Sequence, residues 1–392
     1  MKLFVLLSRV PYPLEKGDKL RAFHFIKQLS KNNKIVLCAL NDKQLHVDAI
    51  KALEPFCESI HIIPLSKIGI AFNLFKGLFN KLPFQVNYFY SKKAQQIIDK
   101  LIDTNQPEHI FCQLVRVAEY VKNCSLPKTL DYQDVFSKGV HRRMEKALFY
   151  LKPMFYFEYR RLLKYEANVF NEFNNKLIIS YPDRDFIEHP QNKDIKVIPN
   201  GVDTEYLKPQ NIEKEYDLLF TGNMAYPPNI DCVEYLVKKI LPLIHKINPL
   251  GKGGRAGANP TKVVLNLQSD KVIVTGWVKD MRVYYAKSKI FIAPMQIGTG
   301  LQNKLLEAMA MKIPSITSEL ANKALNAIEN EEILIGRTEE EYVSHIISLL
   351  TDEAKRDNLV EKAYAFILKN YNWDNIFNQL DEIINKPANA IE

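Results

Sequence analysis

Short apolar runs alternate with amphipathic stretches through the first half of the chain. The run KLFVLLS (2–8) predicts a buried strand, the helical pattern KLRAFHFIKQLSKN follows at 19–32, and KIVLCAL (34–40) predicts a second strand. Strand, helix and strand in this order predict a βαβ unit with parallel strands. The alternation continues with HIFCQL (109–114), KTLDYQD (128–134) and NKLIIS (175–180).

The same alternation begins again in the second half. The segment IKVIPNGVDTEYLKP (195–209) is rich in turn residues and marks a domain junction, after which EYDLLFTGN (215–223) predicts the first strand of a second sheet. One helix pattern and two further strands follow in NIDCVEYLVKKILPLIH (229–245), DKVIVTGWV (270–278) and KIFIAP (289–294). We therefore predict an α/β fold in which two Rossmann-like, doubly wound domains face a central cleft.

These patterns also set the expected domain limits. We place the first domain at 1–198 and the second at 199–369. The last stretch, NYNWDNIFNQLDEIINK (370–386), carries its apolar residues on one helical face. It predicts an amphipathic helix that packs back toward the first domain.

A glycine-rich segment interrupts the second half. INPLGKGGRAGANPTKV (247–263) stands where the alternation requires another strand, so it is either a surface loop or a locally altered strand. The core of this segment, GKGGRAG (251–257), lacks the Lys-Ser/Thr ending of a phosphate-binding P-loop and follows no strand. We expect no phosphate site there.

Composition excludes several classes of protein. A chain of 392 residues is long enough for two domains, and 47% apolar with 25% charged residues is typical of globular proteins. The five cysteines are scattered without a C-x-x-C pair, which argues against a disulfide framework or a zinc site and favours a reducing compartment such as the cytoplasm. The N-terminus lacks a signal-peptide cleavage site, and no apolar run reaches the ~18 residues of a membrane span.

The net charge of the chain is +8, and basic residues cluster with aromatic residues in two segments, 65–93 and 141–166. Anionic headgroups attract such segments while aromatic rings enter the interface, so peripheral contact with the cytoplasmic face of a membrane is one interpretation. Ordinary amphipathic helices packed on a core are the other. The chain has no nucleic-acid-binding motif, and we expect no nucleic acid as partner.

The stretch PMQIGTGLQNKLLEAMAMKIP (294–314) holds the strongest candidate chemistry. It predicts a strand end, a glycine loop and a helix, the geometry that directs free backbone N–H groups at an anion. Lys304 and Glu307 lie three residues apart and share one helix face. A cation beside a phosphate and a carboxylate one turn further would suit a nucleotide diphosphate and its ribose hydroxyls. The alternative is a solvated ion pair without function.

Four segments of the second half occur in a characteristic order: IPNGVD, FTGNMAYPPNIDCVEYLVKKILP, VTGWVKDMRVYYAKSKIFIAP and IGTGLQNKLLEAMAMKIPSITS. This order resembles that of the retaining glycosyltransferases of group 1 (family 4-like), which have the two-domain GT-B fold. It is most similar to bacterial sugar transferases of exopolysaccharide clusters. The resemblance implies a hexosyltransferase that moves a sugar from a nucleotide diphosphate sugar to a glycan or lipid-linked acceptor in surface polysaccharide biosynthesis. It implies retention at the anomeric carbon, with no metal and no cofactor besides the donor substrate.

The resemblance also assigns residues. Lys304 and Glu307 take the catalytic positions, Lys304 offsetting charge on the departing diphosphate and Glu307 binding ribose. The nucleotide-sugar positions are Gly222, Asn223, Gly276, Trp277, Val278, Gly298, Thr299, Gly300 and Leu301. The acceptor-side positions are Gly17, Asp18 and Arg21, and Asp134 is added because it follows a strand end together with Asp131.

The chain departs from the family pattern in places. Thr299 stands where many relatives have a first glutamate, and NMAYPPN follows the strand where many have an Arg and a Lys. No first-domain histidine can be matched, and Gln113 and Arg116 are the nearest polar residues. DRD (183–185) has the letters of a metal-binding D-x-D, but acidic residues at a helix N-terminus need no metal.

Two other functions remain open from the sequence. A nucleotide-sugar 2-epimerase of the same fold would consume the donor without an acceptor. A non-catalytic partner subunit would keep the fold and bind a membrane or an assembly protein. An NAD-dependent oxidoreductase is disfavoured, because no G-x-G-x-x-G follows the first strand.

Overall fold

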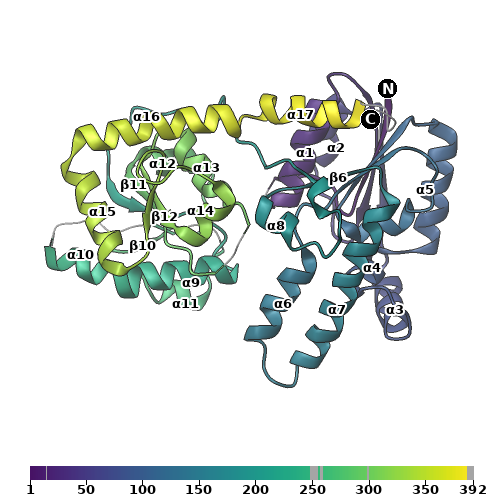
Figure 1. Ribbon diagram of the computed structural model, residues 1–392, viewed down its shortest axis with the longest axis horizontal. Coiled ribbons are helices and arrows are strands. Elements are labelled where there is room, and N and C mark those ends of the chain that lie inside the picture. The colour runs from purple at the N-terminus through teal and green to yellow at the C-terminus, as the bar shows by residue number, and fades with distance from the viewer. Residues whose placement is uncertain (15, 248–254, 257–258, 298–299, 386–392) are drawn as a thin grey trace. The chain divides into compact units, whose positions relative to one another are not determined.

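The computed structural model describes residues 1–14, 16–247, 255–256, 259–297 and 300–385 (Figure 1). The chain divides into two compact units. The first comprises Met1–Pro199 and Phe377–Glu392, and the second comprises Asn200–Ile376. Among the described residues, no helix combines the length and the apolar character needed to cross a bilayer.

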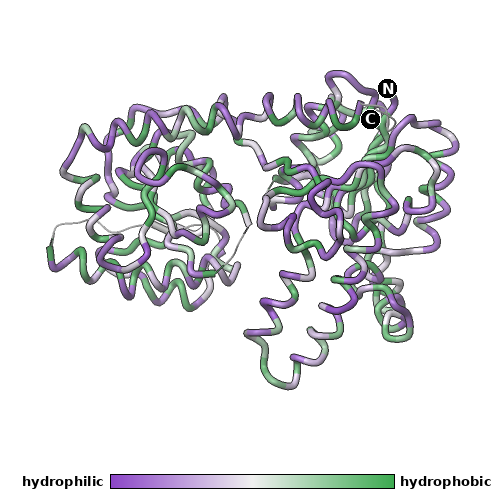
Figure 2. The backbone as a smooth tube through the Cα atoms, in the orientation of Figure 1, coloured by the Kyte–Doolittle hydropathy of each residue, from purple (hydrophilic) through white to green (hydrophobic). Residues whose placement is uncertain are grey.

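The first unit contains a seven-stranded parallel sheet in the order β3-β2-β1-β4-β5-β6-β7. Its central strands β1, β4 and β5 are buried on both faces, as parallel sheets covered by helices require; Leu3 to Leu7 of β1 are at most 1% exposed. Figure 2 shows the resulting concentration of hydrophobic residues along the sheet. The strands are β1 (Lys2–Leu7), β2 (Lys34–Asn41), β3 (Ser59–Pro64), β4 (His109–Gln113), β5 (Lys128–Asp131), β6 (Asn175–Ile178) and β7 (Lys196–Val197).

Helices connect these strands. They are α1 (Gly17–Leu29), α2 (Ala49–Leu53), α3 (Lys67–Gly77), α4 (Phe84–Phe89), α5 (Lys92–Asn105), α6 (Phe136–Lys146), α7 (Lys152–Val169) and α8 (Tyr181–Asp185). The α6–α7 pair projects away from the sheet of this unit (Figure 1).

The second unit contains a six-stranded parallel sheet in the order β10-β9-β8-β11-β12-β13. The strand expected within the glycine-rich segment is present as the two-residue β9, between β8 and β10. The strands are β8 (Tyr216–Leu219), β9 (Arg255–Ala256), β10 (Ile273–Val274), β11 (Ser288–Ala293), β12 (Ser315–Ser318) and β13 (Leu334–Gly336).

The helix expected at 229–245 is observed as α9 (Pro227–Tyr235) and α10 (Leu241–Ile247), joined by a π-helical turn at Leu236–Ile240. The other helices of this unit are α11 (Lys262–Leu265), α12 (Met281–Ala286), α13 (Asn303–Ala310), α14 (Glu319–Leu325), α15 (Glu339–Thr351) and α16 (Glu353–Asn370).

The amphipathic helix expected at 370–386 is α17 (Trp373–Asn385). Its apolar face is buried, with Leu380 at 0% and Ile384 at 3% exposure. The portion from Phe377 onward packs within the first unit, where the backbone oxygen of Ile383 accepts a hydrogen bond of 3.0 Å from the Asn175 amide.

Arg21 differs from its expected place facing an acceptor. Its side chain is completely buried, and its guanidinium donates to both carboxylate oxygens of Asp131, at 2.7 and 3.0 Å. It also donates to the backbone oxygens of Ile198 and Pro199. Asp131, expected to face the cleft or cap a helix, is equally buried. The pair therefore ties α1 and β5 to the end of the first unit, and neither residue offers a free charge to a ligand.

Candidate functional site

Strand order locates the candidate site of the second unit. In the sheet, β9 and β10 lie on one flank of β8, and β11, β12 and β13 lie on its other flank. The order therefore reverses between β8 and β11. Ligands of open parallel sheets bind outside the carboxyl ends of the strands at this point. The segments that leave β8 and β11 there carry Gly222 and the 294–302 loop.

Lys304 lies in the first turn of α13, near the carboxyl ends of β8 and β11. Its ammonium group donates to the side-chain oxygen of Asn229, on α9, and lies 4.4 Å from the centre of the Phe220 ring. Burial lowers the pKa of Lys304 to about 8. The cation is thus held in place by neutral groups, and an arriving anion would be the first full negative charge bonded to it.

Gly222 lies directly against Lys304. A Cβ atom at this position would stand 2.6 Å from the Asn229 amide nitrogen and 3.3 Å from the Lys304 nitrogen. The φ of Gly222 is +154°, which side chains rarely adopt. Asn229 also donates to the backbone oxygen of Asn223 at 2.9 Å, so one amide connects the turn after β8 to the lysine.

Glu307 lies one turn further along α13 and makes a separate set of contacts. Its carboxylate accepts a hydrogen bond of 2.8 Å from the hydroxyl of Tyr285, on α12. That hydroxyl also lies 2.8 Å from the hydroxyl of Thr221. Burial raises the pKa of Glu307, while the Tyr285 bond and the charge of Lys304 act in the opposite direction. The solvated ion pair between Lys304 and Glu307 does not form, because each side chain is bonded elsewhere.

The N-terminus of α13 adds backbone donors. Gln302 precedes the helix without a side-chain capping bond, because its amide group is turned to the Gly300 backbone oxygen at 2.8 Å. Leu301 packs partly on the core of this unit. Helix N–H groups without a cap favour an anion. The expected positions Gly298 and Thr299 lie outside the described residues.

The segment after β10 contains the remaining expected positions, Gly276, Trp277 and Val278. Gly276 has a φ of +69°, and no atom of the described part of the chain lies within 4 Å of where its Cβ would be. Trp277 is 69% exposed, so its ring does not fill the edge of the core. An exposed indole beside an open backbone turn provides a flat apolar surface at the strand ends.

In the first unit the order reverses between β1 and β4. Gly17 and Asp18 open α1 near this point, and the Asp18 carboxylate forms an ion pair of 3.1 Å with Arg9. Gln113, at the end of β4, donates to the Asp18 backbone oxygen at 3.2 Å. Asp134 follows β5 at the surface, but desolvation of its carboxyl and the nearby charge of Asp183 raise its pKa to about 7. These positions form a polar edge of the first sheet.

Arg116 does not contribute a free charge to that edge. Its guanidinium donates to the side-chain oxygen of Gln85, at 3.1 and 2.8 Å, and lies 4.4 Å from the centre of the Phe136 ring. Burial lowers its pKa to about 10. Its contacts connect α4 and α6 to the segment after β4.

The two carboxylates of the DRD segment (183–185) bond to different protein groups. Asp183 is buried and accepts a hydrogen bond of 2.6 Å from the Ser180 hydroxyl, while Asp185 forms ion pairs with Arg184 and Lys193. Within the ranges that the structure describes, no group of three His, Cys, Asp or Glu side chains could hold a metal ion.

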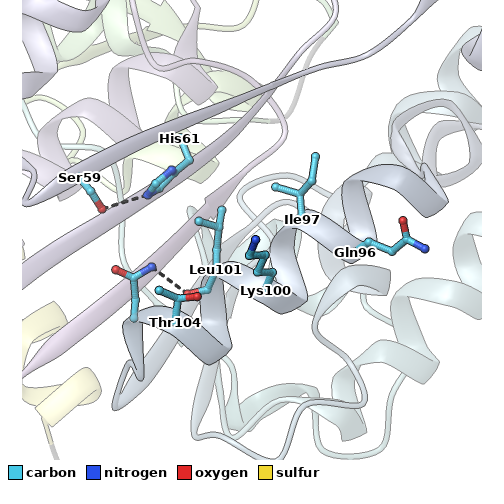
Figure 3. Close-up of a pocket in the computed structure, with 8 residues that line it drawn as sticks. Ser59, His61, Gln96, Ile97, Lys100, Leu101 and Thr104 are labelled. Atoms are coloured by element: carbon cyan, nitrogen blue, oxygen red, sulfur yellow. Dashed lines mark hydrogen bonds between the residues drawn. The ribbon is translucent and has the colours of Figure 1, made fainter.

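A cavity of about 680 Å³ lies beside β3 and α5, where His61 is 3.1 Å from the Ser59 hydroxyl (Figure 3). Ser59 begins β3 and Asn105 ends α5, so this cavity lies toward the amino ends of the strands. It is therefore at the opposite edge of the sheet from the candidate positions.

Sequence reasoning missed several members of this arrangement: Asn229, Tyr285 and Thr221 in the second unit, and Arg9 and Gln133 in the first. Asn229 closes NMAYPPN, the segment that stands in place of the expected Arg and Lys, and that departure was a usable signal. Gln133 has a left-handed φ of 62°, and its buried side-chain oxygen has no hydrogen-bond partner among the residues that the structure describes. Such strain is invisible in sequence.

Comparison with known proteins gives a family match for part of the chain and one curated relative. Residues 215–352 match the model of the family described as Glycosyl transferases group 1, and this range contains Gly222, Tyr285, Lys304 and Glu307. An uncharacterized 44.6 kDa protein in the cps region of Klebsiella pneumoniae is 24% identical over 403 residues, covering 97% of this chain and 98% of that protein.

Solved structures show the same fold. Sucrose-phosphate synthase from Thermosynechococcus elongatus has a TM-score of 0.68 at 14% identity, with 97% of this chain and 98% of that chain covered. HepE from Anabaena, solved in complex with UDP, has a TM-score of 0.68 at 12% identity, with 97% and 99% covered. The expected GT-B fold of two Rossmann-like domains is thereby confirmed.

Proposed function

We propose that this chain, a glycosyltransferase whose residues 215–352 match the group 1 family, moves a sugar from a nucleotide diphosphate sugar to a glycan or lipid-linked acceptor. The second unit binds the donor in this proposal, and the polar edge of the first sheet, with Gly17, Asp18 and Asp134, receives the acceptor. The group 1 match and the UDP complex of HepE support the choice of donor.

The convergence of Lys304, Glu307 and the Gly222 turn carries the proposal. Lys304 and the free amides of α13 bind the diphosphate and stabilise the charge that develops on it as the bond to the sugar breaks. Glu307, oriented by Tyr285, accepts hydrogen bonds from the two ribose hydroxyls. Gly222 keeps the space beside the cation free for a phosphate oxygen.

We further propose that the transfer needs no divalent metal and retains the anomeric configuration. In this proposal fixed cationic and amide groups do the work that a metal ion would do on the leaving group. Retention rests on the resemblance of the motifs to retaining enzymes. Product stereochemistry by NMR and activity in the presence of EDTA test the two points separately.

The biological setting is a proposal as well. The Klebsiella pneumoniae relative lies in a cps region, which supports a role in surface polysaccharide biosynthesis. A lipid-linked acceptor would lie at a membrane, and we propose that the protein works in the cytoplasm in peripheral contact with an anionic membrane surface. The aromatic and basic segments 65–93 and 141–166 support that contact.

A two-stage experiment tests the function. UDP, GDP, ADP and CMP are first compared for their effect on the melting temperature, because a ligand at 100 times its Kd stabilises the folded state by ~2.7 kcal/mol. Sugar conjugates of the base that binds are then incubated with and without acceptor glycans. Acceptor-dependent consumption of the donor is expected. Conversion of the donor to an epimer without an acceptor would instead identify a 2-epimerase, and no thermal shift with any nucleotide would favour a non-catalytic subunit.

A further inference from the structure

Large apolar side chains are exposed at one end of the first unit, on α3 and at the turn between α6 and α7. Figure 2 shows hydrophobic residues at both places, and in Figure 1 both project on the same side of the unit. We call this the α3–α7 apolar surface. It comprises Ile68, Phe72, Phe75, Leu78, Phe79, Leu148, Phe149, Tyr150, Met154, Tyr156 and Phe157, all between 46% and 83% exposed.

The exposure of these side chains excludes, for them, the interpretation of segments 65–93 and 141–166 as ordinary amphipathic helices packed on a core. A helix that only covers a core buries its aromatic rings, whereas Phe79 is 80% and Phe149 is 83% exposed. Clustered exposed apolar groups of this size mark a surface that meets another apolar phase.

The two parts of the surface are joined rigidly through α4 and α7. Arg161, on α7, donates to the backbone oxygens of Gly77, Asn80 and Leu82, which end α3 and lead to α4. Glu158 accepts hydrogen bonds from the backbone nitrogens of Phe84 and Gln85, at 2.7 and 3.1 Å, which open α4. The apolar groups are thus carried on one supported framework.

A cationic cavity of about 730 Å³ opens beside this framework. Lys81, Arg160 and Lys164 line it and are exposed, and none of them forms an ion pair within the part of the chain that the structure describes. Lys122 also lines the cavity but is paired with Glu119 at 2.9 Å. The only other carboxylate among the lining residues is Glu172, so the cavity retains an excess of positive charge.

The inner wall of the cavity carries a neutral hydroxyl. Tyr165 lines the cavity and is 9% exposed. Burial, together with the charge of Glu119 and a hydrogen bond to its carboxylate, raises the pKa of Tyr165, so the hydroxyl keeps its proton. The excess positive charge of the cavity is therefore supplied by its lysine and arginine side chains.

We propose that the α3–α7 apolar surface enters the interface of an anionic bilayer while the cavity between α7 and the α3–α4 connection binds the phosphate of an anionic lipid headgroup. The apolar rings supply burial in the acyl boundary, and Lys81, Arg160 and Lys164 supply attraction to the headgroups. This inference builds on the proposed peripheral membrane contact, but it does not depend on sugar transfer.

Vesicle co-sedimentation of the full chain tests the proposal, with neutral phosphatidylcholine vesicles compared with vesicles that also contain phosphatidylglycerol. Wild type should bind the anionic vesicles and release them at high salt, because screening weakens surface attraction. The double variant Arg160→Gln/Lys164→Gln should bind anionic vesicles about 25-fold more weakly, at about fivefold for each cation removed. The matched control Lys51→Gln/Lys100→Gln removes two exposed lysines of α2 and α5 and should bind as wild type.

A second variant separates the apolar contribution. Phe79→Ser/Phe149→Ser should weaken binding to both kinds of vesicle, and both residues are exposed enough for the fold to be kept. Equal binding of wild type to neutral and anionic vesicles, or unchanged binding of Arg160→Gln/Lys164→Gln, would overturn the headgroup site. Self-association through this surface, detected as a dimer in solution that Phe79→Ser/Phe149→Ser dissolves, would overturn the membrane assignment.

The readout is independent of the enzymatic proposal. Glu307→Ala should keep full vesicle binding while losing transfer activity, and Arg160→Gln/Lys164→Gln should keep activity toward a water-soluble acceptor. Failure of one proposal therefore leaves the other standing.

Discussion

The hydroxyl of Tyr285 lies 2.8 Å from a carboxylate oxygen of Glu307, and the same hydroxyl lies 2.8 Å from the hydroxyl of Thr221. The carboxylate proposed to bind ribose is therefore positioned by α12 and by the segment that follows β8. Tyr285 itself is completely buried, so it acts through Glu307 rather than on the substrate.

Tyr285→Phe should leave the shape of the site intact and remove the bond that orients Glu307. A hydrogen bond to a charged group contributes ~1.5 to 3 kcal/mol, so we expect donor KM to rise by about tenfold while the fold survives. Steady-state kinetics with the donor identified in the panel, together with the melting temperature, give the two readings. An unchanged KM would mean that Glu307 needs no positioning by Tyr285.

Lys304 makes the binding of a nucleoside diphosphate dependent on pH. Burial lowers the pKa of Lys304 to about 8, so the free protein loses this charge as pH rises through that value. A bound anion favours the charged lysine, and affinity should therefore be full below about pH 8 and fall above it.

Calorimetric titration of the nucleoside diphosphate between about pH 7 and about pH 10 measures this dependence, the upper limit lying near the ordinary lysine pKa. Lys304→Met should bind weakly and without the fall. A Lys304→Met variant with the pH dependence of wild type would assign the titration to another group.

Gly222→Ala tests the close approach beside the cation. The added Cβ would stand 2.6 Å from the Asn229 amide and 3.3 Å from the Lys304 nitrogen, at a φ of +154°. Displacement of that amide and backbone strain should cost ~1 to 3 kcal/mol of stability and lower donor affinity.

Gly139→Ala is the matched control for that substitution, because no described residue has an atom within 4 Å of its Cβ position in α6. It should leave activity unchanged and raise stability by ~0.4 to 1 kcal/mol. Equal behaviour of the two alanine variants in thermal denaturation and kinetics would remove the argument for a tight turn at Gly222.

Trp277→Ala tests whether the exposed indole stacks on the base of the nucleotide. Because Trp277 is 69% exposed, the melting temperature of the free protein should hardly change. Base–aromatic stacking contributes ~1 to 3 kcal/mol, so the Kd of the nucleotide should rise by about tenfold. Trp277→Phe should restore most of the affinity. A Kd that is the same for all three proteins would place the base elsewhere.

The sequence predicted the features that depend on local pattern. The helix α13, the shared helix face of Lys304 and Glu307, and the parallel βαβ units follow from spacing and period alone. The resemblance placed Gly222 and Lys304 in one site, and in the structure a Cβ atom added at Gly222 would stand 3.3 Å from the Lys304 nitrogen. The sequence left the glycine-rich segment open between a surface loop and an altered strand, and the structure contains the two-residue strand β9 there.

The features that were not predicted depend on tertiary contacts. From the segment EKGDKLRAF alone, Arg21 is interpreted as a cation available to a ligand. In the structure it pairs with Asp131, 110 residues away in sequence. In the sequence, Tyr285 is one of several aromatic residues of a helix. Only the structure shows that its hydroxyl lies between Thr221 and Glu307. Asn229 gains its role only because α9 returns to the end of β8, which no local pattern specifies.

Binding of a nucleoside diphosphate to wild type and to Glu307→Ala tests the central claim most directly. With the base selected by the thermal panel, isothermal titration should give a Kd at least tenfold higher for Glu307→Ala, since each hydrogen bond to a charged acceptor contributes ~1.5 to 3 kcal/mol. Glu340→Ala, at an exposed position of α15, should bind as wild type. Equal affinities of wild type and Glu307→Ala would contradict the assignment of this pocket to the nucleotide.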